Sequence, residues 1–326
     1  MEQLSNSGSH LAAHLIPNST LYSTSISHKS NMKHLWLGAS LYVPTTHKSL
    51  LEIIQGQRLS TVRSLIFCLE DAVLERDLEF GLDQLVTALP YLEPDPNRLR
   101  FVRVRNPEVM RQVLSMEGIS AIDGFVLPKI SSVTLGAYLL SLSEGSQFSL
   151  MPTLETKEVF EESKMLELRN MLEGVRSQIL SLRIGGNDLL NFLSLRRMKG
   201  KTLYQTPLSS VIARLVSIFK PHGYNLTSPV YDIAFDDHTL RQEVQLDLEH
   251  GLFGKTAIHP SQVEVIEQEY CVTRLELRLA EAILQEDASA VFMIDHHMCE
   301  PATHRNWAWE VVSRAEIYGV QDGVQE

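Results

Sequence analysis

The chain has 326 residues, of which 44% are hydrophobic and 21% charged, and 29 Lys plus Arg stand against 40 Asp plus Glu, for a net charge of −11. This composition can bury a full core, and it excludes a mainly disordered, collagen-like or disulfide-stapled protein. The acidic balance argues against nucleic acid or an anionic membrane as a partner, because such binders neutralise phosphates with basic residues.

Three cysteines, Cys68, Cys271 and Cys299, are an odd number at wide spacing, which is typical of reduced thiols. No apolar run approaches the roughly 18 residues that cross a bilayer. The N-terminus lacks the basic start and the apolar stretch of a secretory signal. We therefore expect a cytoplasmic protein with no membrane partner.

Residues 1–33 contain eight serines and few large apolar side chains. Such a segment cannot offset its own ordering entropy, so a flexible N-terminal arm is predicted. The arm is poor in acidic residues, as transit peptides are, but it contains no Arg, which disfavours a targeting role.

From Trp36 onward, short β-type runs alternate with longer stretches of helical period. The predicted strands are 36–43, 64–69, 99–104, 124–127, 148–154, 179–184, 224–228 and 255–258. Helical patterns between them include 78–89, 158–172, 208–220 and 240–249. Eight strands, each followed by a helix, indicate parallel βα units that close on themselves.

The predicted fold class is therefore α/β, a (β/α)8 TIM barrel over residues 34–288. An open doubly wound sheet would need a glycine-rich turn after its first strand, and residues 42–47 read YVPTTH. A long amphipathic helix is predicted over 261–285. Residues 289–326 are predicted to form a C-terminal helical extension, with a helix over 307–317, and we expect this extension to be a lid or a subunit contact.

Polar residues at the carboxyl ends of the strands are the candidates for an active site, because a barrel of this kind builds its site there. In chain order they are Glu70, Asp71, Arg103, Arg105, Lys129, Glu155, Asn187, Asp188 and His259. Arg105, Lys129, Asn187 and His259 are predicted to bind substrate.

Glu155 and Asp188 each end a β-rich run on adjacent predicted strands. Hard oxygen ligands without Cys or His nearby suit Mg²⁺, which keeps several waters and leaves positions for substrate oxygens. Alternatively, each carboxylate simply caps the helix that follows it. The pairing on neighbouring strands favours the metal site.

Arg103 lies inside the apolar run 101–104, where a guanidinium needs an anion because an unpaired buried charge is costly. One interpretation is a structural ion pair with Glu70 or Asp71. The functional interpretation is a fork that grips a carboxylate or carbonyl oxygen of the substrate.

Three further groups of residues have types that chemistry can use. Asp295, His296, His297, Cys299 and His304 are zinc-ligand residue types, but their spacing matches no usual arrangement. Cys68 is expected to be a small core residue rather than a nucleophile. The basic cluster Arg196, Arg197, Lys199 and Lys201 is either a solvated loop or a clamp for an anionic substrate tail.

Seven segments in this order resemble the citrate lyase β-subunit-like, or HpcH/HpaI aldolase, superfamily of magnesium-dependent carbon-carbon lyases. They are SLYVP at 40–44, LEDAV at 69–73, VRV at 102–104, LPK at 127–129, LET at 154–156, GNDL at 186–189 and GKTAIHPSQ at 254–262. The tail MCEPATHRNWA at 298–308 is similar to a subgroup found beside tellurite and stress resistance genes.

The resemblance implies that Glu155 and Asp188 bind Mg²⁺ and that Arg103 binds and polarises the substrate oxygen. Glu70 and Asp71 would orient metal-bound water or the arginine. The implied chemistry is reversible aldol or Claisen cleavage through an enolate. The resemblance also implies a homo-oligomer, a trimer or hexamer, whose C-terminal extension crosses to a neighbouring subunit.

The chain also departs from the superfamily. Relatives that use coenzyme A have an Arg-Ser pair opening the first strand and a Pro-Gly turn after it, and here Ala39 and Thr45 replace the Arg and the Gly. Cys68, Asn187 and Arg105 replace an Asp, an acidic residue and an Asn. We therefore expect a small anionic keto-acid-type substrate, with or without a phosphate group, rather than a coenzyme A thioester. The alternatives are an acyl thioester lyase or hydrolase using the same site, and a catalytically silent barrel that acts as a binding subunit.

Overall fold

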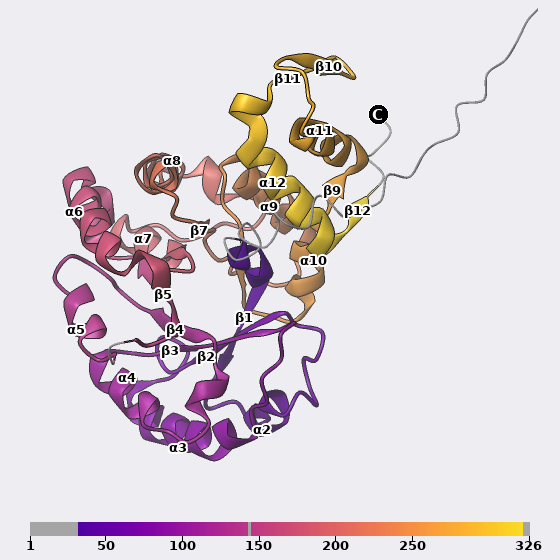
Figure 1. Ribbon diagram of the computed structural model, residues 1–326. Helices are drawn as coiled ribbons and strands as arrows, with labels where there is room; N and C mark the ends of the chain where they lie inside the picture. The colour runs from indigo at the N-terminus through magenta and orange to yellow at the C-terminus, as the bar shows by residue number, and fades with distance from the viewer. Residues whose placement is uncertain (1–31, 143–144, 322–326) are drawn as a thin grey trace, which may run out of the picture.

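Eight parallel strands form a barrel in the computed structural model, which describes residues 32–142 and 145–321 (Figure 1). Apart from its last two positions, the flexible arm predicted for 1–33 lies outside the described residues. The barrel strands are β1 (Ala39–Pro44), β2 (Ser64–Cys68), β3 (Leu99–Arg103), β4 (Gly124–Leu127), β5 (Ser149–Leu154), β6 (Leu182–Ile184), β7 (Leu226–Thr227) and β8 (Lys255–Ala257).

The strands pair in the order β7-β6-β5-β4-β3-β2-β1-β8. A parallel bridge between Ser228 and Lys255 joins the two ends of this order. The backbone nitrogen of Phe253 also donates to the Leu226 carbonyl at 3.0 Å, and that of Ser228 to the Gly254 carbonyl at 2.8 Å. The sheet therefore closes on itself, and the predicted (β/α)8 barrel is confirmed.

Helices follow the strands and cover the outside of the barrel (Figure 1). They are α2 (Leu50–Ile54), α3 (Leu78–Ala88), α4 (Pro107–Leu114), α5 (Leu135–Leu139), α6 (Glu162–Leu172), α7 (Gly186–Phe192), α8 (Leu208–Phe219), α9 (Asp237–Glu249) and α10 (Ser261–Glu269). Short 3-10 helices lie at Lys33–Leu37, Glu75–Asp77, Leu89–Tyr91, Ile119–Ala121, Lys157–Phe160, Glu173–Gln178, Leu203–Gln205 and Lys220–His222.

The start of α4 shows how local sequence sets an element boundary. The Asn106 side chain accepts a hydrogen bond from the Val109 backbone nitrogen at 2.9 Å and so caps the helix. Pro107 follows at the first helical position, where its missing N–H costs nothing. Helix α4 therefore begins only four residues after Arg103, the last residue of β3.

Alternate strand residues face two separate cores. Leu65, Phe67 and Leu69 belong to the large core between barrel and helices. Ile66, with Phe101, Val126 and Met151 from the next strands, belongs to a smaller apolar cluster. This second cluster fills part of the barrel interior, so the barrel is a packed structure and not a pore.

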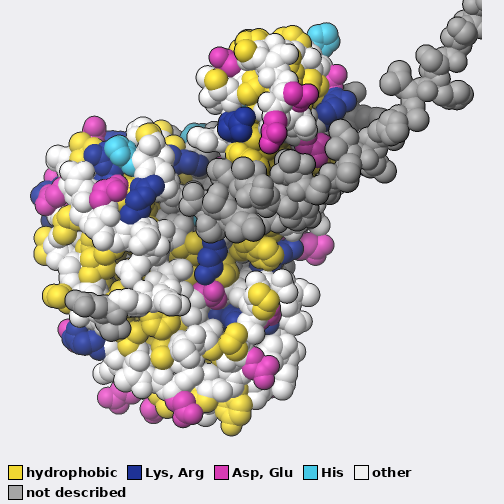
Figure 2. All heavy atoms as spheres, viewed as in Figure 1, with side chains coloured by type: hydrophobic (Ala, Val, Ile, Leu, Met, Phe, Trp, Pro, Cys, Tyr) yellow, Lys and Arg dark blue, Asp and Glu magenta, His cyan; other side chains and the backbone are white. Residues whose placement is uncertain are grey.

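A separate unit with its own core follows the barrel. It consists of α11 (Arg274–Leu284), the hairpin β10 (Phe292–Ile294) and β11 (His297–Cys299), and α12 (Pro301–Tyr318), while β9 (Val272–Thr273) pairs with β12 (Val320–Gln321). Its core includes Leu279, Ile283, Cys299, Ala308 and Val311. Figure 1 shows it above the barrel, and Figure 2 shows hydrophobic side chains at its surface.

The single helix predicted over 261–285 is wrong, because the structure divides it into α10 and α11. Thr273 caps α11: its hydroxyl accepts from the Glu276 backbone nitrogen at 3.1 Å, and the Glu276 carboxylate accepts from the Thr273 nitrogen at 2.7 Å. This capping box starts a new helix inside a continuous amphipathic pattern. The C-terminal unit thus begins near residue 272, earlier than the boundary expected at 289.

The C-terminal unit returns to the amino-terminal end of the barrel. The Tyr318 hydroxyl donates to the Leu35 carbonyl at 2.6 Å, and the Arg63 guanidinium donates to the Ile317 carbonyl at 3.1 Å.

In the part of the chain that the structure describes, no helix is both long enough and apolar enough to span a bilayer.

Candidate active site

Six charged side chains meet at the carboxyl ends of neighbouring barrel strands. Glu70 and Asp71 follow β2, Arg103 ends β3, Lys129 follows β4, Glu155 follows β5, and Asp188 lies in the first turn of α7. Parallel strands bring their carboxyl ends to one edge, which is where barrel enzymes react. The structure therefore gathers six of the nine residues that were singled out from the sequence.

Arg103 is the centre of this group. One guanidinium nitrogen, Nη2, lies 2.8 Å from Glu70 Oε2, 3.0 Å from Asp71 Oδ2 and 3.3 Å from Glu155 Oε1. Its Nε is buried without a hydrogen-bond partner among the described residues. A buried donor that lacks a partner is expensive, so Arg103 has hydrogen-bonding capacity left for another acceptor.

Lys129 links the same carboxylates from the next strand. Its backbone nitrogen donates to Glu155 Oε1 at 2.9 Å, and its ammonium contacts Glu70 and lies 3.4 Å from Asp71 Oδ1. Its backbone is left-handed, with φ at 52°, which is uncommon for a residue with a side chain. In this conformation the Lys129 N–H points at the Glu155 carboxylate and donates a hydrogen bond to it.

Gly185 makes room for Glu155. A Cβ at Gly185 would lie 2.3 Å from Glu155 Oε2, so any side chain there would displace the carboxylate. Glu155 is 3% exposed, and burial together with the Asp188 carboxylate raises its pKa to about 7, against the opposing pull of Arg103. Burial also raises the pKa of Asp188.

Glu70 and Asp71 form a second carboxyl pair with opposite shifts. Burial raises the pKa of Glu70. Burial would also raise the pKa of Asp71, but the hydrogen bond with Glu70 and the positive charges of Arg103 and Lys129 lower it. Glu70 is thus the member that holds a proton more readily, and Asp71 stays ionised.

The donor set fits a hard divalent cation. Four carboxylates, at 70, 71, 155 and 188, face two cations, Arg103 and Lys129, so the ionised group carries an excess of two negative charges. Within residues 32–142 and 145–321, no three His, Cys, Asp or Glu side chains form a metal-ligand set. Glu155 and Asp188 would thus supply two ligands and leave the rest to water or substrate.

The remaining predicted residues lie at the edge of this group. Arg105 is bound to the loop that carries Glu70 and Asp71: it donates to the Val73 carbonyl at 2.5 Å and pairs with Glu75 at 2.9 Å. Asn187 is exposed at the start of α7. His259 is exposed after β8, where Ser261 Oγ lies 2.8 Å from its Nδ1 and the Phe235 ring packs beside it.

The basic cluster after β6 does not form one surface. Arg197 is buried, pairs with Glu243 at 2.5 Å and Asp232 at 3.2 Å, and donates to the Val230 carbonyl. Arg196, Lys199 and Lys201 are exposed. Arg197 is therefore part of the fold and is not free to clamp a substrate tail.

The zinc-type residues lie in the C-terminal unit, away from the barrel strands: four lie on the β10–β11 hairpin and His304 lies in α12. His296 and His297 are exposed, and Asp295 pairs with Arg278. Cys299 is buried in that unit's core, and Cys68 is buried under the barrel mouth, where burial raises the pKa of its thiol.

Tyr42 in β1 was not singled out from the sequence. Its ring lies between two guanidinium groups, 5.8 Å from that of Arg103 and 5.6 Å from that of Arg183. The available signal was strand alternation, which puts Tyr42 on the opposite face from the buried residues Leu41 and Val43. The aromatic ring thus separates the charged mouth from a second arginine inside the barrel.

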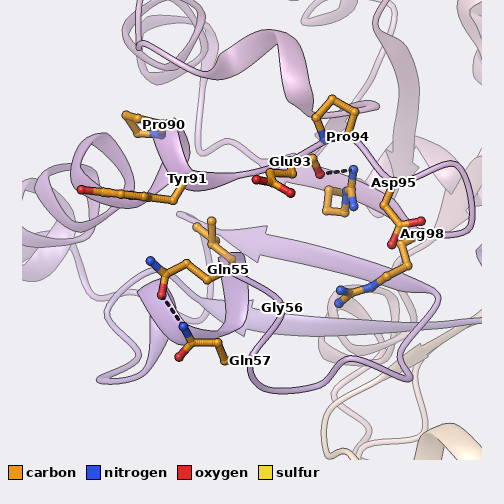
Figure 3. A pocket seen from close by; sticks show the side chains of 11 residues that line it. Gln55, Gly56, Gln57, Pro90, Tyr91, Glu93, Pro94, Asp95 and Arg98 are labelled. Atoms are coloured by element: carbon orange, nitrogen blue, oxygen red, sulfur yellow. Dashed lines mark hydrogen bonds between the residues drawn. The ribbon is translucent and has the colours of Figure 1, made fainter.

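Two surface hollows lie at the amino-terminal end of the barrel, opposite the charged group. One, of about 660 Å³, lies between the end of α2 and the loop before β3, where Arg98 and Tyr91 line it (Figure 3). The other, of about 870 Å³, lies under the starts of β5, β6 and β7 and is bordered by α12. Neither contains a residue of the charged group.

Comparison with known proteins places this geometry in a family context. A family model described as C-C bond lyase of the TIM-barrel fold matches residues 31–320. A protein named (3S)-malyl-CoA thioesterase from Cereibacter sphaeroides is 27% identical over 243 residues, which cover 74% of this chain and 79% of that protein.

Solved structures share the fold at lower identity. CitE from Mycobacterium tuberculosis, in complex with magnesium, acetoacetate and coenzyme A, has a TM-score of 0.64 at 18% identity, covering 86% of this chain and 98% of that one. RipC from Yersinia pestis has a TM-score of 0.57 at 18% identity, covering 75% and 100%.

Proposed function

Because the chain belongs to the C-C bond lyase family of the TIM-barrel fold, we propose that it is a magnesium-dependent lyase that cleaves a small anionic keto-acid-type substrate through an enolate. The observation that carries the proposal is the pair Glu155 and Asp188, two carboxylates beside Arg103 whose pKa values are both raised, chiefly by burial. A divalent cation would replace the proton that this pair otherwise retains. CitE, which shares the fold, was crystallised with magnesium.

Glu155 and Asp188 would hold the ion, and bound magnesium would supply a Lewis acid for negative charge on substrate oxygens. Arg103 donates hydrogen bonds to the same oxygen. Asp71 is half exposed and can move away from Arg103, whereas Glu70 and Glu155 are buried and keep the guanidinium aimed at the mouth.

Glu70 suits the proton transfer, because burial raises its pKa and so makes its carboxylate a stronger base than an exposed one. In the cleavage direction its carboxylate takes the hydroxyl proton of the substrate. The carbon-carbon bond then breaks, the new carbonyl leaves with one fragment, and the electron pair forms the enolate of the other. Lys129, in contact with Glu70, favours the ionised state of Glu70 before the proton arrives.

Thioester hydrolysis is the second candidate, since relatives of 27% identity are named (3S)-malyl-CoA thioesterase. It would use the same carboxylates and Arg103 on an acyl thioester. Against it, Ala39 and Thr45 are fully buried and cannot reach a ligand from the positions where coenzyme A users are expected to carry Arg and Gly. A catalytically silent barrel would bind neither magnesium nor a keto acid.

The test is calorimetric titration of Mg²⁺ in the presence of pyruvate, with the variants Glu155→Gln and Asp188→Asn. Each amide keeps the shape and gives up the charge, so we expect magnesium affinity to fall by about 10-fold or more, at least the loss caused by removing an outer-shell partner. Glu162→Gln, an exposed carboxylate on the following helix, is the matched control.

Unchanged magnesium affinity in both variants would contradict the metal site. Product analysis then separates the two reactions, because carbon-carbon cleavage releases a carbonyl compound and thioester hydrolysis releases a free thiol. Malyl coenzyme A converted to malate and free thiol, with no carbonyl product, would replace the lyase by the thioesterase.

A further inference from the structure

A polar sector lies inside the barrel, below the charged mouth. Thr153 in β5 is in register with Arg183 in β6, and Arg183 is in register with Thr227 in β7. The Arg183 guanidinium crosses to β8, where its Nη2 donates to Thr256 Oγ1 at 2.5 Å. Four neighbouring strands thus place three hydroxyls and one guanidinium close together.

Strand alternation puts these side chains inside the barrel. Leu154, Leu182, Ile184 and Leu226 belong to the outer core between barrel and helices. Their neighbours Thr153, Arg183 and Thr227 therefore point the other way, into the interior. The opposite part of the interior is apolar, filled by the cluster that contains Ile66, Phe101 and Val126.

Arg183 has no counter-ion in this sector, and two of the three hydroxyls have no hydrogen-bond partner among the described residues. Arg183 is 2% exposed, and its contacts are Thr256 Oγ1, Met151 Sδ at 3.8 Å and the Tyr42 ring. Among the described residues, no carboxylate lies within ion-pair distance of it. The hydroxyls of Thr153 and Thr227 are buried and have no hydrogen-bond partner in the same part of the chain. Arg103 is therefore matched by three carboxylates, while Arg183 is matched by none.

A buried guanidinium without a counter-ion is strongly destabilising, and buried hydroxyls without partners add to that cost. An anionic ligand group would satisfy all of them together, since a carboxylate accepts from a guanidinium and from hydroxyl donors. The fixed fork of arginine suits the planar carboxylate.

The sector lies two strand residues deeper in the barrel than the proposed magnesium ligand Glu155. Thr153 precedes Glu155 by two residues, and Arg183 precedes Gly185, which contacts Glu155, by two residues. Two residues of strand rise by about 7 Å, which matches the length of a keto acid of about five carbons. Tyr42 and Thr256 are partly exposed, and the Tyr42 ring lies 5.8 Å from the Arg103 guanidinium, so these two side chains lie between the sector and the mouth.

We propose that Arg183, with Thr153, Thr227 and Thr256, binds a second carboxylate of the substrate. Arg183 is then a specificity residue that selects keto acids with an acidic group at the far end. The inference rests on the proposed function, because it assumes that the keto-acid end binds beside Glu155 and Asp188.

The experiment compares 2-oxoglutarate with 2-oxovalerate, which has a methyl group in place of the far carboxylate. Calorimetry on the full chain with Mg²⁺ should show tighter binding of 2-oxoglutarate. Arg183→Met should weaken 2-oxoglutarate by about 30-fold or more and leave 2-oxovalerate within about twofold, as expected for loss of one partner of a buried charge pair. Thr227→Val, which keeps the shape and the fold, should weaken only 2-oxoglutarate, by about 10-fold.

Arg314→Met is the matched control, since Arg314 is also buried but lies in the C-terminal unit, on α12, and donates to the Tyr270 carbonyl. It should leave both affinities unchanged. Equal affinity of the wild type for the two acids, with binding still dependent on Glu155, would overturn the Arg183 subsite and leave the lyase proposal intact. Binding of neither acid would overturn both, and an equal loss of both acids in Thr227→Val would show a merely structural role.

Discussion

Arg103 concentrates the charge of the barrel mouth on a single nitrogen. Nη2 meets three carboxylates within 3.3 Å, while Nε has no partner among the described residues. A structural ion pair needs only one of these carboxylates. The two additional carboxylates favour the functional interpretation, in which the guanidinium exchanges one carboxylate for a substrate oxygen during each turnover.

Arg103→Lys should therefore fail to support turnover. An ammonium is a point charge and cannot reproduce the fork, so we expect a loss of about 100-fold or more in kcat, comparable to removal of an oxyanion donor. Steady-state kinetics, with urea unfolding as the check on stability, measures it. A lysine variant that is fully active but less stable would identify Arg103 as a structural ion-pair residue.

Glu155 should make the metal-free protein sensitive to pH. Its pKa in the fold, about 7, lies above the ordinary value of 4.5, so the folded state holds a proton that the unfolded state releases. The free energy of unfolding should accordingly fall as pH rises from about 4.5 to 7, by up to about 1.4 kcal/mol per pH unit, and then level off. Magnesium affinity should rise over the same range, because the ion competes with this proton.

Urea titrations at pH 5.5 and 7.5 measure this effect. The matched variant is Glu155→Gln, which cannot titrate at that position and should lose the part of the pH dependence that Glu155 causes. An identical pH dependence in the wild type and in this variant would show that Glu155 ionises normally.

At the scale of elements, a buried charge network fastens β8 to α9. The Lys255 ammonium lies 3.0 Å from Glu243 Oε1 and 2.8 Å from Asp247 Oδ2, and it donates to the Pro229 carbonyl. Glu243 also pairs with Arg197, which ties in the segment after α7. The strand that closes the barrel is therefore held by paired charges on its outer face.

Glu243→Gln should destabilise the protein by about 3 to 5 kcal/mol, because it leaves Lys255 and Arg197 buried with too little negative charge. Denaturant unfolding measures the difference in free energy. Glu249→Gln, an exposed carboxylate on the same helix, should change it by less than about 0.5 kcal/mol. Similar losses in the two variants would contradict the network.

The order of elements was predictable because each barrel strand is a short apolar run between polar segments. The break at Thr273 was not, since an amphipathic pattern continues across a capping box. The candidate site residues were predictable as a set, because a barrel builds its active site from the residues that follow its strands. Arg183 carried the same signal as Arg103, a charge inside an apolar strand, but only the closed barrel shows that no carboxylate faces it.

At the scale of the whole molecule, the net charge of −11 coexists with cationic side chains placed at the centre of the barrel. The face seen in Figure 2 mixes basic and acidic side chains without one continuous basic surface. Small anions can therefore be bound inside an acidic protein by local charge. The family and the fold expected from the sequence are confirmed, while the trimer or hexamer and the cytoplasmic location stay predictions.

Contacts between the first and the last described parts of the chain affect how the protein folds during synthesis. The first strand, β1, pairs with the last, β8, and the carbonyl of Leu35 receives its hydrogen bond from Tyr318, near the end of α12. During translation, β1 leaves the ribosome long before β8 and Tyr318 are synthesised. Closing contacts between such distant parts of a chain is slow, so the nascent barrel exposes an open strand edge until synthesis is almost complete.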